Sequence, residues 1–261
     1  MNMQGKVVII TGSSSGIGAA TAQMCAEAGA AVVVNYSRNL AGAEATVAAC
    51  EAVGGRAIAV QADVAQDATC RKLAEAAISH FDRIDYLVNN AGTTKFAPME
   101  DLDALNADDF ARIFRVNVTG AYQMTRACVP YMRKQGAGAI VNVSSNSAFL
   151  GTGSCMAYAA SKGALNTMTI SMARILAPEI RVNAVCPGFV RGDWIRRGLG
   201  DKGFEEAKAR WEADVPLGTT AEPDDIAEAI VYLLAGARVV TGETLLLNAG
   251  VHLKKAALVR K

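Results

Sequence analysis

Two side chains that could carry out acid–base chemistry, Tyr158 and Lys162, lie four residues apart in an alanine-rich segment. This composition favours a helix, and residues at positions i and i+4 of a helix are neighbours on one face. A cation close to a tyrosine stabilises the phenolate and lowers the pKa, which is about 10 in the free side chain. We therefore expect Lys162 to make Tyr158 a usable acid–base group near neutral pH.

Other polar residues accompany this pair. Ser144 and Ser145 end one apolar run, an Asn-Asn-Ala-Gly segment (89–92) ends another, and Asn117 lies between the two in the sequence. The Tyr-x-x-x-Lys spacing alone also fits two surface side chains. Its occurrence together with these motifs favours a catalytic site.

A glycine-rich loop lies near the start of the chain, between a short apolar run and a helical segment that continues to Ala28. Glycine permits a tight turn and a close approach of the backbone to a pyrophosphate, and the free N–H groups of a helix N-terminus attract anions. The spacing is Gly-x-x-x-Gly-x-Gly, which differs from the common Gly-x-Gly-x-x-Gly pattern. A purely structural turn is the alternative, but the strand–loop–helix context favours nucleotide binding. The expected binding residues are Thr11, Gly12, Ser13, Ser14, Ser15, Gly16, Ile17 and Gly18.

The second apolar run ends in Tyr36, Ser37 and Arg38, which we expect to bind the cofactor. In NAD-binding proteins an acid at this point normally meets the ribose 2′-hydroxyl, yet the next acid in this chain is Glu44. Ser37 can donate a hydrogen bond, and Arg38 can pair with a 2′-phosphate. The sequence therefore predicts a preference for NADP(H) over NAD(H), with a solvated loop charge as the alternative interpretation of Arg38.

Seven short apolar runs, separated by longer alanine-rich stretches, must position these residues. They are Lys6–Ile10, Ala31–Asn35, Ala57–Gln61, Ile84–Asn89, Ala139–Ser144, Ile180–Val185 and Thr244–Asn248. Most are continuously apolar, as expected for strands that are covered on both faces. We expect one doubly wound (Rossmann) α/β domain over residues 1–261, with a mostly parallel seven-stranded sheet flanked by helices. The charged segment at about 189–215, which contains Trp194 and Trp211, is expected to form a small helical lid over the substrate pocket.

The composition excludes several classes of protein. The chain has 261 residues, 51% of them hydrophobic, and its 26 basic and 25 acidic residues give a net charge of +1. A disordered chain and a charge-driven nucleic-acid-binding protein are therefore not expected. The six cysteines and two histidines lack the spacing of a metal site, which predicts no metal and a reduced, cytoplasmic protein. We expect neither a signal peptide nor a membrane span.

Taken in order, these motifs resemble the short-chain dehydrogenase/reductase family in its single-domain form, from about Gly5 to Gly250, and in particular members similar to 3-oxoacyl-carrier-protein reductases. The resemblance implies further cofactor-binding residues beside the adenine, at the end of a central strand and after the sixth strand. These are Asp63, Val64, Asn90, Ala91, Gly92, Pro187, Gly188 and Val190.

The resemblance also implies the catalytic roles. Tyr158 would donate a proton to the substrate oxygen in reduction, and Ser145 would hydrogen-bond to that oxygen. Lys162 would hold the ribose hydroxyls of the cofactor in addition to lowering the pKa of Tyr158. Asn117 would keep a water molecule that joins Lys162 to solvent.

Two positions depart from the family pattern. Gly192 stands where a threonine commonly contacts the nicotinamide carboxamide, which predicts one missing cofactor hydrogen bond and a looser hinge for the lid. The segment Asn248-Ala249-Gly250 replaces the frequent Asp-Gly-Gly, and this change is expected to affect a structural turn more than the chemistry.

These observations predict an NADP(H)-dependent oxidoreductase that transfers a hydride between the nicotinamide and a small carbonyl or secondary alcohol substrate, with a 3-oxoacyl thioester as one candidate. A sugar, polyol or steroid dehydrogenase is the alternative enzyme. A catalytically silent NADP(H)-binding sensor protein is the alternative from another class, and the presence of Ser145, Tyr158 and Lys162 argues against it. The resemblance implies a homotetramer, and no nucleic-acid or membrane partner is expected.

Overall fold

A seven-stranded parallel sheet, with the strand order β3-β2-β1-β4-β5-β6-β7, forms the centre of the molecule. The structure is a computed structural model and describes residues 1–253, so the last eight residues of the expected domain lie outside it. The strands are β1 (Val7–Ile10), β2 (Ala31–Tyr36), β3 (Arg56–Gln61), β4 (Tyr86–Asn89), β5 (Gly138–Val143), β6 (Ile180–Pro187) and β7 (Thr244–Leu247). The prediction of a doubly wound sheet is confirmed.

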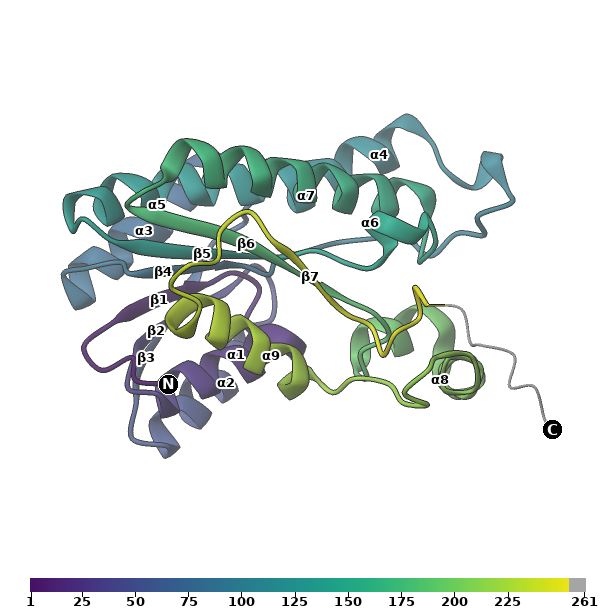
Figure 1. Cartoon of the computed structure of the whole chain (residues 1–261), viewed down its shortest axis with the longest axis horizontal. Helices are drawn as coiled ribbons and strands as arrows, with labels where there is room; N and C mark the ends of the chain where they lie inside the picture. Colours follow the sequence, from purple (N-terminus) through teal and green to yellow (C-terminus); the bar gives the residue numbers. More distant parts are fainter. Residues whose placement is uncertain (254–261) are drawn as a thin grey trace.

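Helices cover both faces of this sheet (Figure 1). One face carries α1 (Gly16–Glu27), α2 (Leu40–Ala52) and α9 (Pro223–Val231). The other carries α3 (Asp67–Phe81), α5 (Ala121–Lys134) and α7 (Met156–Leu176). The remaining helical elements are η1 (Leu102–Ala104), α4 (Ala107–Phe114), η2 (Arg115–Gly120), α6 (Ser147–Leu150), α8 (Asp193–Asp214) and η3 (Tyr232–Gly236).

The continuous apolar runs follow from burial on two sides. Successive side chains of a strand point to opposite faces, so Val8 and Ile10 of β1 pack in the core beneath α1 and α9, while Ile9 packs in the core beneath α3 and α5. All three side chains are fully buried. A strand with two covered faces favours apolar side chains along its length, and the polar motifs of this chain follow the strand ends.

The strand order reverses between β1 and β4, because the chain runs outward from β1 through β2 and β3 and then returns. At such a point the loops that follow neighbouring strands diverge and leave a crevice at the carboxyl edge of the sheet. The glycine-rich loop after β1 and the Asn-Asn-Ala-Gly segment after β4 both open onto this crevice.

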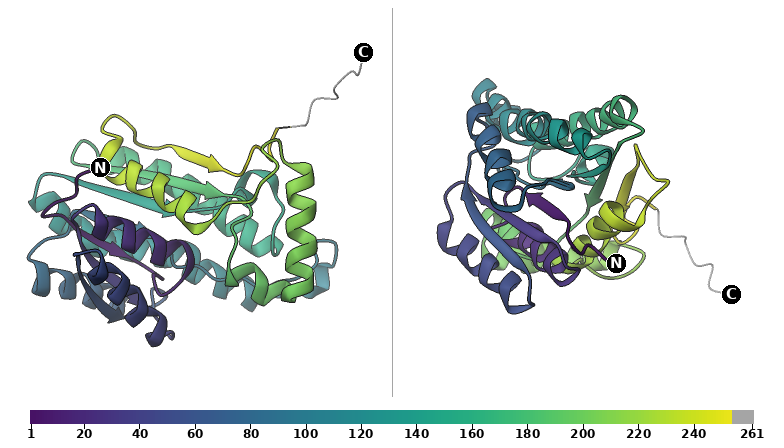
Figure 2. Two further views of the ribbon diagram at one scale, coloured as in Figure 1. Left: turned by 90° about the horizontal axis from the view of Figure 1, so that it is seen from below. Right: turned by 90° about the vertical axis from the view of Figure 1, so that its left-hand side faces the viewer.

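Helix α8 lies at this edge of the sheet, away from the two helical layers (Figure 2). It begins after Gly192, whose φ of +143° is rarely adopted by L side chains, and it is broken at Gly200, whose φ is +70°. Glycine accepts these angles because it has no Cβ. The segment between the two glycines is therefore a short helical piece with a hinge-compatible residue at each end. Within residues 1–253, no helix combines the length and the hydropathy needed to cross a lipid bilayer.

Candidate active site

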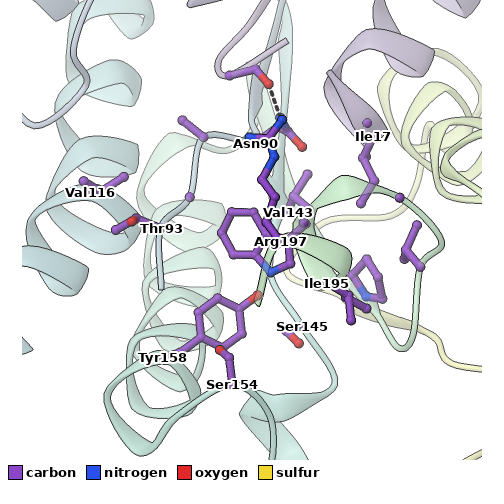
Figure 3. Close-up of a pocket in the computed structure, with 18 of the residues that line it drawn as sticks. Ile17, Asn90, Thr93, Val116, Val143, Ser145, Ser154, Tyr158, Ile195 and Arg197 are labelled. Carbon is purple, nitrogen blue, oxygen red and sulfur yellow. Dashed lines mark hydrogen bonds between the residues drawn. The ribbon is translucent and has the colours of Figure 1, made fainter. Parts of the chain in front are cut away.

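The sheet edge carries one large cleft of about 1570 Å³, and most residues predicted from the sequence line it (Figure 3). The predicted residues on its walls are Gly12, Ser14, Ser15, Gly16, Ile17, Ser37, Arg38, Asp63, Val64, Asn90, Ala91, Gly92, Ser145, Tyr158, Lys162, Pro187, Gly188 and Val190. The cleft thus joins the glycine-rich loop to the tyrosine–lysine pair. Five predicted residues do not line it, namely Thr11, Ser13, Gly18, Tyr36 and Asn117.

Tyr158 and Lys162 lie on one face of α7, one turn apart, as the spacing predicts. The ammonium of Lys162 is 5.5 Å from the centre of the Tyr158 ring. The centre of the Trp194 ring, which belongs to α8, is 6.3 Å from the centre of the Tyr158 ring. The lysine side chain is 3% exposed, and its Nζ donates a hydrogen bond to the carbonyl oxygen of Val143 at 2.7 Å. The end of β5 therefore fixes the lysine, and α8 covers the tyrosine.

Ser145 reaches the same place from the end of β5. Its Oγ accepts the backbone N–H of Ser147 at 3.1 Å and lies 3.1 Å from the Ser147 hydroxyl. A second hydrogen bond joins the Ser145 hydroxyl to Oδ1 of Asn146 at 3.4 Å. These three side chains are at most 7% exposed, so the turn that starts α6 holds the orientation of Ser145.

The pKa of Tyr158 differs in direction from the expectation. Burial raises it to about 12, and a hydrogen bond with Ser145 opposes that rise. Burial also lowers the pKa of Lys162 from 10.5 to about 8. The predicted lowering of the Tyr158 pKa is therefore wrong for this structure, because desolvation, which disfavours the charged form of both groups, is the largest cause of each shift. Tyr158 is a protonated acid at neutral pH.

Asn117 lies on η2, a π-helical segment, and is 1% exposed. Its Oδ1 accepts the N–H of Thr93 at 2.7 Å, and its Nδ2 donates to the Thr93 carbonyl and to the Ser161 hydroxyl, both at 3.0 Å. Its amide is thus bonded to the segment after β4 and to α7. A Cβ added at Gly92 would lie 3.6 Å from Asn117 Oδ1 and 3.9 Å from Lys162 Nζ, so the three residues are close together. The water-holding role of Asn117 stays a prediction.

The glycine-rich loop has the geometry of a phosphate cradle. Gly12 has a φ of +62°, and a Cβ there would lie 2.9 Å from the Cα of Ala91. Gly16, with a φ of +55°, faces open space in the cleft. Helix α1 starts at Gly16, and the side chain of its N-cap residue, Ser15, makes no capping hydrogen bond. The first N–H groups of α1 are therefore available to an anion in the cleft, which fits the pyrophosphate of a dinucleotide.

Three predicted residues of the glycine-rich loop do not line the cleft but hold the loop in its conformation. Thr11 Oγ1 accepts the N–H groups of Asn90 and Ala91, each at 3.0 Å, and so ties the loop after β1 to the segment after β4. Ser13 Oγ donates to the Ile10 carbonyl at 2.7 Å. A Cβ on Gly18 would lie 2.6 Å from Nδ2 of Asn90, so this glycine allows close packing rather than contact with a ligand.

Asn35, which the sequence reasoning did not select, connects the loop to β2. Its Oδ1 accepts the N–H of Gly12 at 3.0 Å, and its Nδ2 donates to the carbonyl of Ala62 at 3.0 Å. It is 2% exposed and also lines the cleft. A single polar residue at the end of the apolar run 31–34 was the available signal.

The end of the cleft beside β2 and β3 contains Ser37, Arg38, Asp63 and Val64. Arg38 is exposed and, among residues 1–253, it forms no ion pair. Its guanidinium is therefore free to contact a ligand at this end. Tyr36, in contrast, does not line the cleft.

The opposite end is formed by the segment after β6. A Cβ on Gly188 would lie 2.6 Å from the Trp211 ring and 2.9 Å from the Cα of Asn248, so only glycine fits there. Asn248 Oδ1 accepts the N–H of Gly250 at 3.1 Å, which closes the turn, as expected for a structural role. Ala249 within this turn has a φ of +52°, a conformation that L side chains rarely adopt.

One wall of the cleft, formed by the loop that follows β4, has no counterpart in the predicted set. Phe96 follows β4, and a Cβ added at Gly198 of α8 would overlap its ring, so the lid packs directly on this loop. Lys95 beside it pairs with Asp109 of α4 at 2.7 Å and fixes the loop. The contact of Phe96 with Gly198 joins residues that are about a hundred positions apart in the sequence, and no local pattern indicates it.

Comparison with known proteins gives a consistent picture. Residues 12–252 match the family model described as Enoyl-(Acyl carrier protein) reductase. The chain is 43% identical to an uncharacterized oxidoreductase of Methylorubrum extorquens, over 96% of this chain and 99% of the relative. It is 40% identical to an L-rhamnose 1-dehydrogenase (NAD(P)(+)) of Azotobacter vinelandii, over 94% of this chain and 96% of the relative. It is 35% identical to a 3-oxoacyl-acyl-carrier-protein reductase of Thermotoga maritima, over 96% of this chain and 99% of the relative.

Solved structures show the same fold. A crystal structure from Burkholderia xenovorans, described as a short-chain dehydrogenase/reductase, superposes with a TM-score of 0.88 at 40% identity and covers 95% of this chain and 98% of its own. A 7α-hydroxysteroid dehydrogenase in complex with NADH and 7-oxo glycochenodeoxycholic acid has a TM-score of 0.88 at 31% identity, with 95% of each chain covered.

Proposed function

Because this chain belongs to the short-chain dehydrogenase/reductase family, whose members are oxidoreductases, we propose that it is an NADP(H)-dependent carbonyl reductase or secondary-alcohol dehydrogenase. The observation that carries this proposal is that Ser145, Tyr158 and Lys162 line the same cleft as the phosphate cradle at the start of α1. A bound nicotinamide cofactor would supply or accept the hydride. All other steps can be assigned to side chains of this protein.

In reduction, the hydroxyl of Tyr158 gives its proton to the substrate oxygen while the carbonyl carbon gains the hydride. Its pKa of about 12 keeps it protonated, and therefore ready to donate, at neutral pH. Ser145 donates a hydrogen bond to the same oxygen as negative charge develops there. The ammonium of Lys162, 5.5 Å from the centre of the tyrosine ring, stabilises the phenolate that remains.

The preference for NADP(H) is supported by the end of β2. Ser37 and Arg38 line the cleft, and no carboxylate follows β2 before Glu44. An arginine without an ion pair can form a bidentate contact with a 2′-phosphate, and the site offers no acceptor for a 2′-hydroxyl in the usual position. Comparison of kcat/KM for NADPH and NADH tests this, and a preference for NADH would contradict it.

The substrate is proposed to be a small carbonyl compound, with a 3-oxoacyl thioester as the leading candidate. The 35% identity to a 3-oxoacyl-acyl-carrier-protein reductase supports this candidate. A sugar dehydrogenase is the second candidate, because an L-rhamnose 1-dehydrogenase is 40% identical to this chain. Polyol and steroid dehydrogenases belong to the same group of alternatives. The three catalytic side chains in one cleft weigh against a silent sensor protein.

A screen of NADPH consumption over acetoacetyl thioesters, simple ketones, aldehydes and sugars separates these functions. Faster turnover of acetoacetyl thioesters than of sugars would support the leading candidate. Oxidation of L-rhamnose or another aldose, without thioester reduction, would replace it by the second. Tight binding of NADPH without turnover of any carbonyl would favour the sensor protein.

We also propose that the protein is a cytoplasmic homotetramer. Large apolar side chains are exposed on α7 and on the edge strand β7: Ile170 is 48% exposed, Ile175 67% and Leu245 39%. Burial of such side chains between identical subunits would stabilise a symmetric assembly. Size-exclusion chromatography with light scattering gives the mass directly, and a monomer at micromolar concentration would contradict the proposal.

A further inference from the structure

Positive charge predominates among the described residues that line the cleft. Six cationic side chains and two carboxylates, Asp63 and Asp193, face it. The cationic residues are Arg38, Arg112, Arg115, Lys162, Arg191 and Arg197. A cleft whose walls carry mostly positive charge attracts negatively charged ligands and raises their local concentration.

Several of these cations already have a partner or a role. Arg191 pairs with Glu222 at 2.6 Å and with Glu212 at 3.4 Å, and its Nε donates to Thr220 at 2.7 Å. Arg112 donates to the Thr93 hydroxyl at 3.3 Å and pairs with Asp109 at 3.4 Å. These two arginines hold loops together. Arg38 lies at the cofactor end, Lys162 is catalytic in the proposed function, and Arg115 begins η2, outside the lid helix α8.

Arg197 differs from them in its position. It lies one turn after Trp194, whose ring is 6.3 Å from that of Tyr158, and directly before Gly198, which packs on Phe96. Residues i and i+3 of a helix share a face, so Arg197 and Trp194 both face the cleft over the catalytic tyrosine. In the view of Figure 3, Arg197 lies between Asn90 on one side and Tyr158 and Ser145 on the other.

The guanidinium of Arg197 is weakly held. Within residues 1–253 its one ion pair is with Asp193 at 3.3 Å, and the two side chains are 75% and 70% exposed. Ion pairs that are this exposed contribute little. The adjacent Arg196, in contrast, pairs with Asp201 at 2.9 Å and packs at 4.1 Å on the Phe204 ring, so it stabilises the helix itself. Arg197 has no such structural task.

We propose that Arg197 determines substrate specificity by binding an anionic group, a carboxylate or a phosphate, on the carbonyl substrate. The inference rests on the proposed function of this cleft. The guanidinium would leave Asp193 and form a charge-assisted, bidentate hydrogen bond with the anion, for which its planar shape is suited. Trp194 and Phe96 would contact the apolar part of the same molecule. The carbonyl would then face Tyr158 and Ser145.

The test measures kcat/KM for matched pairs of charged and neutral ketones with Arg197→Gln, Arg197→Lys and wild-type protein. One arm compares 2-, 3- and 4-oxo carboxylates with their ethyl esters. The other compares acetoacetyl-coenzyme A with the acetoacetyl thioester of N-acetylcysteamine, which lacks phosphate. Arg210→Gln is the matched control, because Arg210 is an exposed arginine of the same helix that does not line the cleft.

The proposal predicts that Arg197→Gln lowers kcat/KM about tenfold to a hundredfold for charged substrates in at least one arm, and less than threefold for their neutral counterparts. Arg197→Lys recovers part of the loss, and Arg210→Gln has no effect. The arm that responds identifies the anion as a carboxylate or as a phosphate.

Equal effects on charged and neutral substrates would overturn the proposal. A higher KM for NADPH in Arg197→Gln would also overturn it, since Arg197 would then bind the cofactor. In both cases wild-type turnover of ketones would leave the proposed function standing. If the wild-type protein reduces none of these ketones, the proposed function fails first, and the inference fails with it.

Discussion

Replacement of Lys162 by methionine tests the buried cation at the centre of the site. The lysine is 3% exposed, and burial lowers its pKa from 10.5 to about 8. This difference corresponds to about 3 kcal/mol by which the folded state disfavours the charged form. Below about pH 8, Lys162 is protonated in both the folded and the unfolded protein, and the folded state is destabilised by the full amount. Between about pH 8 and 10.5 the unfolded chain binds more protons than the folded one, so stability rises with pH.

The free energy of unfolding of the wild type should therefore rise relative to that of Lys162→Met by about 2.5 kcal/mol between pH 7 and pH 10. The methionine variant shares every other titrating group, so the difference between the two proteins isolates the lysine. Urea denaturation at fixed protomer concentration measures it. Lys202→Met is the control, because the Lys202 side chain is 92% exposed and no such trend is expected. A difference that stays constant from pH 7 to pH 10 would refute the reasoning.

Three further predictions follow from the same contacts. Tyr158→Phe should lower kcat/KM by about a hundredfold or more and leave the dissociation constant of NADPH unchanged in a fluorescence titration, because only the proton donor is removed; activity close to wild type would exclude Tyr158 as the acid. Arg38→Asp should shift the ratio of kcat/KM for NADPH and NADH at least tenfold towards NADH, since a 2′-phosphate would lose its partner and a 2′-hydroxyl would gain an acceptor; an unchanged ratio would make Arg38 a solvated charge. Ala249→Gly should raise the free energy of unfolding by about 1 kcal/mol, because φ at this position is +52°; no change in urea denaturation would mean that the turn is unstrained.

The sequence predicted the layer structure well because local pattern and global fold agree in this protein. Each of the seven apolar runs forms a strand, and the boundaries differ by one or two residues. The largest differences, of two residues, are at the end of β6, which extends to Pro187 rather than Val185, and at the start of β4, which begins at Tyr86 rather than Ile84. Asp85, just before it, still bonds to both neighbouring strands, because its N–H donates to the Val7 carbonyl at 2.9 Å and its carbonyl accepts the Ala139 N–H at 3.1 Å. Its carboxylate also accepts the Val7 N–H at 3.0 Å and pairs with Lys6 and Arg83.

Residue types and spacing identified the glycine-rich loop, the end of β2 and the tyrosine–lysine pair, and the family resemblance identified eight further residues that line the cleft. These residues meet because the carboxyl ends of neighbouring parallel strands lie at one edge of the sheet. Residue types and spacing did not separate residues that face the cleft from those that build it. Thr11 and Ser13 have the same types as residues of a binding loop, but their hydroxyls are used by the backbone of neighbouring segments. Asn117 is likewise engaged by Thr93 and Ser161.

The features that sequence reasoning missed depend on tertiary contacts and on burial. The packing of Gly198 on Phe96 joins the lid to the loop after β4, and only the folded chain brings them together. The pKa of Tyr158 could not be predicted from its distance along the helix to Lys162, because the sequence gives the neighbour but not the extent of desolvation.

Transfer of an isotopic label tests the central claim most directly. The protein is incubated with NADPH deuterated at the transferred position and with the carbonyl panel, and the alcohol product is examined by mass spectrometry and NMR. We expect one deuterium on the carbinol carbon of at least one product with the wild type, and a loss of about a hundredfold or more in its rate of formation with Tyr158→Phe. Saturating cofactor binding without a labelled product from any carbonyl, or equal labelling by both proteins, would contradict the account.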